Sequence, residues 1–325
     1  MEKIKALKKE LNQEFSSMIQ PKRFSAPHLL AISTSWLFIV GVLSFATWMD
    51  SVWVWALSLP LVAGTQHGLM ILMHEGAHHH ISKNSRLNEW ISDLFCAWPV
   101  LLDTRLYRAN HLKHHLYLST EKDPDWIRKK DLKEWRFPQT RSFFFMELGK
   151  MALWKGPREW MVIARLFFDN KSKVKAATKS LLWLTFGILA AVFPLLRPAV
   201  FAYSASLLFV FPIFQRVRSI AEHFGLEDES EINMTRDIKG TFVESFFFYP
   251  FGVGLHLSHH MFPQVPFYQL KKVHARLKES CKEKELTPHM NNHFFFGSKS
   301  VLKDLTKAST REPVRQKPSL ENQAS

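Results

Sequence analysis

Histidine is the residue type whose number and spacing point most directly to chemistry in this chain. There are 16 histidines among 325 residues, and two segments share the spacing H-x-x-H-H. The first segment holds His111, His114 and His115, and the second holds His256, His259 and His260. Side chains three and four positions apart lie on one face of a helix. Each segment therefore predicts a face of three imidazoles that is able to chelate a metal.

A third group, His74 and His78, lies in the segment His-Glu-Gly-Ala-His-His-His, and His223 stands alone further along the chain. Residues four apart on a helix are separated by about 6 Å along its axis. Close imidazoles repel one another when charged and are costly to bury without a partner, whereas a metal needs them neutral and close together. Nine imidazoles exceed the four ligands of one zinc ion, so the pattern indicates two metals.

Long uncharged segments are the elements that must position these histidines. Phe24–Met49 contains no Asp, Glu, Lys or Arg, and the same holds for Ser51–Met73. Two further uncharged runs of 17 and 18 residues lie on either side of Arg197. A helix needs about 20 apolar residues to cross a bilayer. We therefore predict an all-α integral membrane protein with two helical hairpins, whose spans cover 29–49, 51–73, 180–196 and 198–215.

The distribution of basic residues predicts how these spans are oriented. Six Lys and Arg residues precede the first span, none separates the first two spans, and nineteen lie between Glu75 and Ala177. By the positive-inside rule, we expect both termini on the cytosolic side. The histidines are expected on the same side, in a helical cap. The shorter apolar stretches Ile91–Leu102 and Ser142–Trp154 are expected to lie in the membrane interface.

The composition agrees with a lipid-embedded protein rather than with a nucleic-acid-binding one. The formal charge is +14, but 46% of the residues are apolar and the mean hydropathy of −0.11 averages apolar spans with basic segments. We divide the chain into a basic leader (1–27), a membrane domain (28–280) and a polar tail (281–325). The tail is expected to be disordered from Val301 onward, because no periodic apolar face is evident there.

The three histidine groups and the paired spans resemble the integral-membrane fatty acid desaturase and hydroxylase superfamily. The segment Met261–Leu270, which follows the last group, is similar to the same place in acyl-lipid desaturases. The resemblance covers roughly residues 30 to 280. It implies a non-haem centre of two irons that uses O2 and two electrons to desaturate a fatty acyl chain of a lipid. The implied iron ligands are His74, His78, His111, His114, His115, His223, His256, His259 and His260.

Further residues are candidates for supporting roles around such a centre. His79, Glu75 and Asp125 are candidates for additional metal ligands or for outer contacts to the ligands. Phe246, Phe247, Phe248 and His67 are candidates for lining a substrate tunnel. Arg218 and Glu222, four residues apart, are expected to pair with each other. His274 and His289 fall outside the ligand spacing, and we expect neither to be needed for activity.

Two other functions compete with lipid desaturation. A hydroxylase or ketolase of another lipid, such as a carotenoid or sphingoid base, would use the same ligands. More distantly, His74-Glu75-Gly76-Ala77-His78 matches the H-E-x-x-H signature of zinc metalloproteases, although that function leaves the other histidine groups unused. A metal transporter would need more ionisable residues inside its spans.

The chain lacks a recognisable site for a redox cofactor that could supply the electrons. It shows no glycine-rich dinucleotide fingerprint, no flavin motif and only two cysteines. An external donor is therefore expected, and the resemblance implies an acidic one, ferredoxin or cytochrome b5 with its reductase. The basic residues near the second histidine group form a candidate docking patch for such an acidic partner, and they are Lys113, Arg128, Lys129, Lys130 and Lys133.

Overall fold

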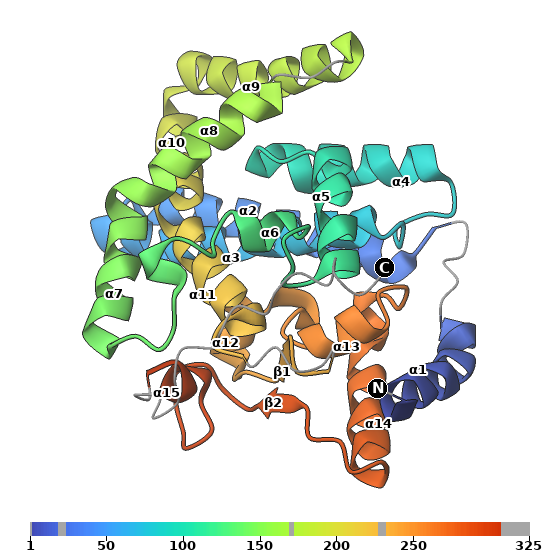
Figure 1. Ribbon diagram of the computed structural model, residues 1–325. Helices are drawn as coiled ribbons and strands as arrows, with labels where there is room; N and C mark the ends of the chain where they lie inside the picture. The colour runs from blue at the N-terminus through green and yellow to red at the C-terminus, as the bar shows by residue number, and fades with distance from the viewer. Residues whose placement is uncertain (1, 19–23, 169–171, 227–231, 307–325) are drawn as a thin grey trace.

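The computed structural model describes residues 2–18, 24–168, 172–226 and 232–306. Within these ranges the chain is mainly helical, with one small sheet, which confirms the all-α prediction (Figure 1). Four helices are long and apolar enough to cross a membrane: α2 (Ala26–Met49), α3 (Val52–Ala77), α9 (Lys173–Val192) and the helix Pro194–His223. The last comprises η6 (Pro194–Leu196), α10 (Arg197–Ala205), the π-helical segment η7 (Ser206–Val210) and α11 (Phe211–His223).

The ends of the spans differ from the sequence prediction in two places. Helix α3 continues to Ala77, so His74 and Glu75 lie inside its last turn rather than after it. The break in the second pair falls after Val192 rather than at Arg197-Pro198, and Pro198 lies in the first turn of α10. Proline is tolerated in the first turn because the N–H that it lacks would have no helical partner there.

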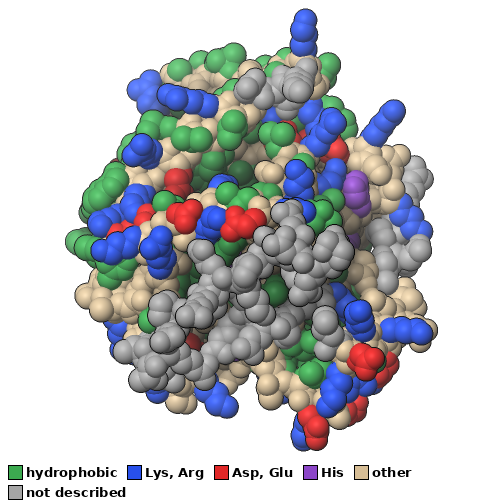
Figure 2. All heavy atoms as spheres, viewed as in Figure 1, with side chains coloured by type: hydrophobic (Ala, Val, Ile, Leu, Met, Phe, Trp, Pro, Cys, Tyr) green, Lys and Arg blue, Asp and Glu red, His purple; other side chains and the backbone are tan. Residues whose placement is uncertain are grey.

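Helix α3 is the central element of the molecule. Its most apolar stretch is 72% buried, whereas that of α9 is 6% buried. Helix α3 packs against α2, α5, α11 and α12. Glycines at 64 and 68 allow this close packing, because a Cβ at either position would meet the ring of Phe246 or Phe251. Helices α2 and α9 instead expose large apolar side chains such as Leu37 and Leu184. Figure 2 shows hydrophobic side chains on the outer surface of the molecule.

The region between the two pairs of long helices consists of short helices. They are α4 (Ser85–Ser92), η2 (Asp93–Ala97), η3 (Trp98–Val100), α5 (Thr104–Tyr117), α6 (Pro124–Ile127), η4 (Lys133–Trp135), α7 (Arg141–Lys150), η5 (Met151–Lys155) and α8 (Gly156–Phe168). The two stretches expected at the membrane interface correspond to α4–η3 and α7–η5, and their place in the interface remains a prediction. Asp103 is the N-cap of α5, and its side chain accepts hydrogen bonds from the N–H groups of Arg105 and Leu106.

A buried ion pair joins α9 to the start of α5. The Lys179 ammonium is fully buried, lies 2.8 Å from Asp103 and also donates to the Phe167 carbonyl at 3.0 Å. A buried lysine is costly unless it is paired in this way. The contact therefore fixes the second pair of long helices relative to the helix that carries three of the histidines.

The C-terminal third of the chain folds back beneath the long helices. It contains β1 (Arg236–Ile238), α12 (Phe242–Phe247), η8 (Pro250–Gly252), α13 (His256–Met261), η9 (Phe267–Gln269), α14 (Leu270–Glu283), β2 (His289–Asn291) and α15 (Val301–Thr306). The two strands pair in parallel, with Arg236 opposite His289. Helix α1 (Glu2–Phe15), followed by η1 (Ser16–Met18), lies beside α14 and buries Leu7, Leu11 and Phe15 (Figure 1).

The expectation of a disordered tail from Val301 is wrong for its first residues. Residues 301–306 form α15, in which Val301, Leu302 and Leu305 are buried. These three apolar side chains occupy one face of a short helix, a signal that is too brief to stand out in the sequence. Residues 307–325, and 19–23 of the predicted leader, lie outside the described residues.

Candidate metal centre

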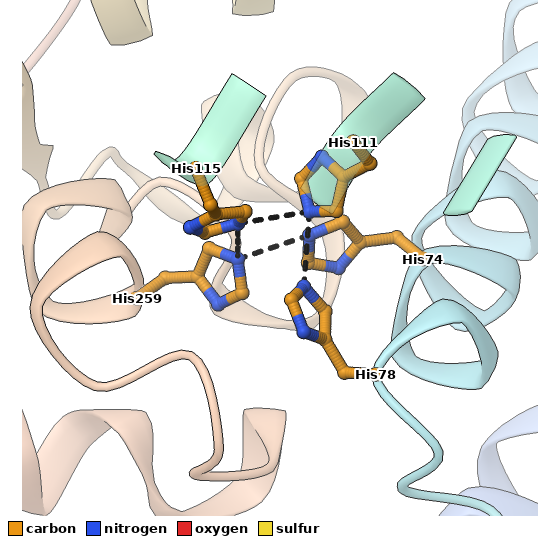
Figure 3. A group of neighbouring side chains, drawn as sticks. All are labelled: His74, His78, His111, His115 and His259. Atoms are coloured by element: carbon orange, nitrogen blue, oxygen red, sulfur yellow. Dashed lines mark hydrogen bonds between the residues drawn. The ribbon is translucent and has the colours of Figure 1, made fainter. Parts of the chain in front are cut away.

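All nine predicted ligands come together, and they do so as two clusters. The larger cluster contains His74, His78, His111, His115 and His259, and the smaller one contains His114, His223, His256 and His260. Within each cluster, one nitrogen of every imidazole lies within 4.8 Å of those of the others. Figure 3 shows the five rings of the larger cluster pointing inward from three separate segments.

The H-x-x-H-H spacing explains how two helices serve both clusters. On α5, His111 and His115 face the larger cluster, while His114 faces the smaller one. On α13, the order is reversed, because His256 and His260 face the smaller cluster and His259 faces the larger one. Helix α3 completes the larger cluster and the end of α11 completes the smaller. The rings of His115 and His260 stack at 4.1 Å between centroids, so the two clusters are neighbours.

The contacts within the larger cluster cannot all be hydrogen bonds. The Nε2 atoms form a chain of four contacts at 2.9–3.1 Å, which runs from His74 through His259, His115 and His111 to His78. Each imidazole nitrogen has either one proton or one lone pair, so it takes part in only one hydrogen bond. Five nitrogens therefore make at most two hydrogen bonds, and the remaining contacts are repulsive.

The smaller cluster has the same feature. Its Nε2 atoms form three contacts at 2.9–3.2 Å, from His114 through His223 and His256 to His260. A cation at the centre of each cluster removes the repulsion, because every lone pair is then directed at it. The nine imidazoles therefore fit two metal ions.

Electrostatics favour the neutral form that a metal ligand needs. Burial first, and then the neighbouring imidazoles, hold the pKa of His111, His256, His259 and His260 well below the ordinary value. The same causes lower the pKa of His115 to about 2. Because a protonated imidazole has no lone pair to offer, these environments keep the nitrogens available for coordination.

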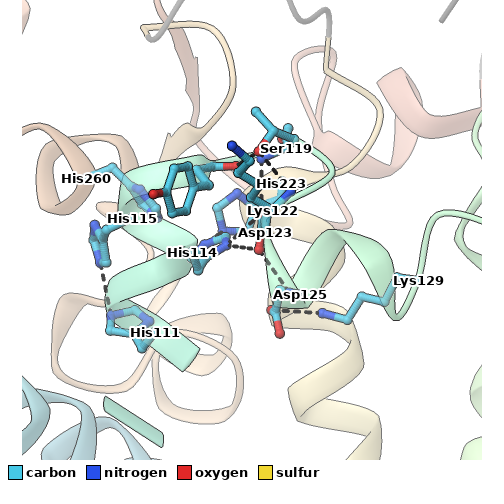
Figure 4. A network of polar contacts seen from close by, with 12 residues as sticks. His111, His114, His115, Ser119, Lys122, Asp123, Asp125, Lys129, His223 and His260 are labelled. Carbon is cyan, nitrogen blue, oxygen red and sulfur yellow. Dashed lines mark hydrogen bonds and ion pairs between the residues drawn. The ribbon is translucent and has the colours of Figure 1, made fainter. Parts of the chain in front are cut away.

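A carboxylate does contact the far nitrogen of a predicted ligand, His114, but it is Asp123 rather than the predicted Asp125. Nδ1 of His114 donates to Asp123, with both carboxylate oxygens at 3.0 Å (Figure 4). Asp125 instead forms ion pairs with Arg128 and Lys129. Asp123 is the N-cap of α6 and is 2% exposed, so its position is fixed by the turn that precedes Pro124. Such contacts fix the tautomer and orientation of a ligand.

Arg218 and Glu222 form the predicted pair, and the pair has a second neighbour. The Arg218 guanidinium donates to Glu222 at 2.8 Å. The same carboxylate oxygen lies 3.4 Å from Nδ1 of His256. Tyr107, one turn before His111, contacts Nδ1 of that histidine at 3.4 Å. Neither contact was predicted, although the spacing of Tyr107 on α5 is a signal that sequence reasoning had available.

Glu75 faces away from the larger cluster and is fully engaged. One of its oxygens accepts from His28 at 3.1 Å, from His80 at 3.0 Å and from the Phe267 N–H at 2.9 Å. Its other oxygen lies 3.7 Å from Nδ1 of His74. Glu75 thus links α2, α3 and the segment after α13 next to His74, a predicted ligand. A metalloprotease would need this carboxylate free beside a metal-bound water, so the geometry does not support that function.

The two additional histidines of the first group have different environments. His80 is buried against Glu75, whereas His79 is exposed and adopts a left-handed backbone with φ of 62°. His79 belongs to neither cluster. The predicted role of an outer contact to the metal ligands therefore suits His80 and Glu75 but not His79.

His274 is a supporting residue that the sequence analysis set aside. Its Nδ1 lies 2.6 Å from Asp237, and Asp237 also accepts from the N–H and hydroxyl groups of Ser258 at 3.0 and 2.6 Å. Ser258 is in the middle of the third histidine group. His274 therefore contacts α13 through Asp237, and the expectation that activity does not need it stays a prediction.

The tunnel candidates divide into two groups. Phe246 lines a large cavity next to α3. Phe247 and Phe248 pack against Phe214 instead, and His67 donates to the Phe247 carbonyl at 2.8 Å. Phe246 thus remains a candidate for contact with a substrate, while the other three pack beside the cavity wall.

Comparisons with known proteins agree with this arrangement. The family model described as fatty acid desaturase matches residues 50–291. The chain is 27% identical to dihydrorhizobitoxine desaturase of Bradyrhizobium elkanii over 257 residues, which cover 72% of this chain and 70% of that protein. It is 23% identical to the chloroplastic omega-6 fatty acid desaturase of Spinacia oleracea, covering 79% of this chain and 60% of that protein.

A third similar protein is the sphingolipid delta(4)-desaturase of Rattus norvegicus. The identity is 25% over 300 residues, which cover 86% of this chain and 81% of that protein. The family match spans most of the chain and includes all nine clustered histidines. The chain belongs to the fatty acid desaturase family and is an oxidoreductase.

Proposed function

We propose that this protein uses two irons, O2 and two electrons to desaturate an acyl chain of a membrane lipid. The observation that carries the proposal is the pair of adjacent clusters built wholly from imidazoles. The five histidines of the larger cluster would hold one iron, and the four of the smaller cluster would hold the other. When bound, the irons supply the activation of O2 that allows hydrogen to be removed from an unactivated methylene.

The chain's own residues hold the imidazoles neutral, oriented and shielded from water. Asp123 accepts the Nδ1 proton of His114 and so leaves the Nε2 lone pair of that ring free. Glu75 and Glu222 carry negative charge behind His74 and His256. All three carboxylates are buried, which strengthens their interaction with the ligands.

The names of the three relatives support desaturation as the outcome. All three are desaturases, although the compounds in their names differ. Hydroxylation or ketolation of another lipid is the second candidate, because it requires the same ligand set and differs only in the fate of the substrate. The substrate class is therefore proposed as a lipid with an acyl chain.

The orientation and the electron donor are also part of this proposal. His28, at the start of α2, contacts Glu75 at the end of α3, which supports an antiparallel first hairpin with the histidines at its inner end. We propose two such hairpins, with both termini and the histidine clusters on the cytosolic side. There the site would receive electrons from ferredoxin or from cytochrome b5 and its reductase.

Lipid analysis of a host that expresses the chain tests this function. The host lipids are compared by mass spectrometry with those of a host that expresses His260→Ala at the same level. A product lighter by two hydrogens is expected only with the wild-type chain. A product heavier by one oxygen would favour the hydroxylase. If an iron-loaded protein that receives electrons forms neither product, both the desaturase and the hydroxylase function are contradicted.

A further inference from the structure

Three helices meet at the last turn of α3, between His74 and His78. Gly76 and Ala77 lie between these two histidines and end the helix. The last carbonyl groups of a helix have no partner within it, so they need donors from elsewhere. Helices α4 and α5 both pack against α3 (Figure 1) and supply such donors. The contacts at this turn therefore affect the position of the first histidine group relative to the second.

Arg108 of α5 donates to two successive carbonyl groups of this turn. Its Nε donates to the Ala77 carbonyl at 2.9 Å, and its Nη2 donates to the Gly76 carbonyl at 3.1 Å. A guanidinium is planar and holds its N–H groups in a fixed fork, so two such bonds fix orientation as well as distance. Arg108 precedes His111 by three residues, which places both on one face of α5. One side chain thus links the helix of the second histidine group to the end of the helix of the first.

The third direction of the guanidinium is held by α4. Nη1 of Arg108 donates to Glu89 at 3.4 Å. The Lys175 ammonium, in the first turn of α9, donates to the same carboxylate. Burial raises the pKa of Glu89, but Lys175 and Arg108 lower it by more, so the net pKa is below its ordinary value. Glu89 is therefore ionised at neutral pH and orients the guanidinium.

Helix α4 also binds the last turn of α3 directly. Asn88 donates to the Gly76 carbonyl at 2.7 Å, and its side-chain oxygen accepts from the Ile81 N–H at 3.1 Å. A Cβ at position 76 would meet the side chain of Ser92, so glycine is required where α4 approaches the end of α3. The turn is thus held by Asn88 on α4 and by Arg108 on α5.

These contacts concern the larger histidine cluster and not the smaller one. The larger cluster takes ligands from both α3 and α5, whereas the four histidines of the smaller cluster lie on α5, α11 and α13. Nε2 of His78 on α3 lies 2.9 Å from Nε2 of His111 on α5. A shift of the end of α3 along α5 would change this distance and would leave the distances within the smaller cluster unaltered.

We propose that Arg108 is a positioning residue for the larger cluster, because it binds the last turn of α3 from α5 and so sets the geometry in which that cluster holds its metal. The proposal rests on the proposed function and adds a residue, outside the nine histidines, that controls one of the two metal positions. Arg108 acts through the backbone of Gly76 and Ala77. Its loss leaves the smaller cluster able to bind metal.

Iron retention by the full-length protein in detergent tests this inference without turnover. Each protein is loaded with ferrous iron without oxygen and exposed to rising concentrations of a chelator, and the iron left per chain is measured. Arg108→Gln removes the charge and the fork of donors, while Arg108→Lys keeps only the charge. Arg105→Gln is the control, because Arg105 is an exposed arginine one turn earlier on the same helix.

We expect the wild-type protein to keep two irons at a chelator concentration at which Arg108→Gln keeps one. Loss of an outer contact costs about 10–100-fold in metal affinity. Arg108→Lys should fall between the two, because an ammonium has a single nitrogen and cannot reproduce the fork. Arg105→Gln should match the wild type. Equal retention of both irons by Arg108→Gln and the wild type would overturn the inference.

Double variants identify which iron Arg108→Gln loses. His78→Ala removes a proposed ligand from the larger cluster, and His256→Ala removes one from the smaller. Arg108→Gln should cause no further loss of iron in His78→Ala, since both changes affect the same cluster. In His256→Ala it should remove the iron that remains. The opposite pattern, or equal further losses in both backgrounds, would overturn the inference.

Circular dichroism of the same samples separates the loss of this contact from unfolding. Arg108→Gln should keep the helix content of the wild type. Loss of both irons with unchanged helix content would overturn the selectivity for the larger cluster. If the helix content of Arg108→Gln falls, Arg108→Lys takes its place, and wild-type iron retention by a folded Arg108→Lys would then contradict the inference.

Lipid products, measured in parallel, separate this inference from the proposed function. If the wild type holds two irons and forms the desaturated product while Arg108→Gln releases iron as the wild type does, the inference alone fails. If Arg108→Gln loses one of two irons selectively but the wild type forms no lipid product, the proposed function fails and the inference holds.

Discussion

At the scale of single residues, the two clusters depend on which face of a helix each histidine occupies. His115 belongs to the larger cluster and His260 to the smaller, yet their rings stack on each other. Loss of either imidazole removes a proposed ligand from one cluster and a packing contact from the other. We therefore expect substitution of His115 or His260 to lower activity as much as substitution of the other clustered histidines.

Four single alanine substitutions test this directly: His111→Ala, His115→Ala, His256→Ala and His260→Ala. Each should lower activity by more than about a hundredfold and reduce the iron content, since ligand loss exceeds the 10–100-fold cost of losing an outer contact. Iron per chain and product formation are the measurements. His79→Ala, at an exposed position outside both clusters, is the control and should change neither. Full activity in His115→Ala or His260→Ala would show that the clusters are not a metal site.

The outer contact from Asp123 permits a sharper comparison of two neighbouring carboxylates. Asp123→Asn keeps the shape but removes the charge that holds the His114 tautomer, so we expect a 10–100-fold loss in iron affinity or activity. Asp125→Asn is the matched control, because Asp125 pairs with Arg128 and Lys129 instead, and its loss should be smaller. A larger effect from Asp125→Asn than from Asp123→Asn would contradict the assignment.

The histidine groups predicted that these side chains come together, but not that each H-x-x-H-H segment divides its three imidazoles between the two clusters. The spacing of the carboxylates did not predict which of them contacts a histidine of the clusters. Helical periodicity fixes the faces of α5 and α13, so three and four residue separations translate directly into neighbours. Asp123 and Asp125 lie in a turn, where one residue more or less changes the direction of the side chain. Likewise, the link from His274 through Asp237 to Ser258 joins three segments far apart in the chain and leaves no local signal.

At the scale of helices, the apolar runs predicted the four long helices because length and hydropathy are local properties. Their ends were less predictable, since π and 3-10 segments such as η6 and η7 extend or interrupt a helix without a change in composition. Helix α15 was missed because its buried face consists of only three residues. Helix α1 owes its place to packing on α14, which is a tertiary contact.

The basic segment around α6 is less uniformly available for docking than its composition suggests. Arg128 pairs with Asp125, and Lys130 pairs with Glu121. Lys129 is half-buried, where it contacts Asp125, Ser219 and the Trp135 ring. Lys129 therefore belongs to the interior of the cap. Lys113 and Lys133 are the exposed lysines of this patch that no carboxylate neutralises among the described residues.

Reversal of these two charges tests the docking patch. Lys113→Glu with Lys133→Glu should slow turnover driven by an acidic donor about tenfold at low salt and reduce its salt dependence. Iron content should be unchanged, because neither side chain contacts the clusters. Lys278→Glu with Lys282→Glu on α14 carries the same change in net charge and is the control. Equal rates in the two variants would place the donor elsewhere.

At the scale of the whole molecule, the proposal requires both histidine clusters to lie on one side of the membrane. Cysteine labelling tests this, because Cys96 and Cys281 are buried and react slowly. Burial also raises the pKa of Cys281 to about 11, which disfavours its reactive thiolate. A membrane-impermeant reagent added from outside should label Asp50→Cys and fail to label Thr120→Cys. The reverse pattern would contradict the proposed orientation.

The central claim is that the two histidine clusters together hold two irons in one chain. Metal analysis of the purified protein by mass spectrometry, normalised to the amount of chain, measures this directly. We predict two irons per chain in the wild-type protein. One zinc per chain, or a wild-type iron content that is unchanged in His111→Ala and in His256→Ala, would contradict the account.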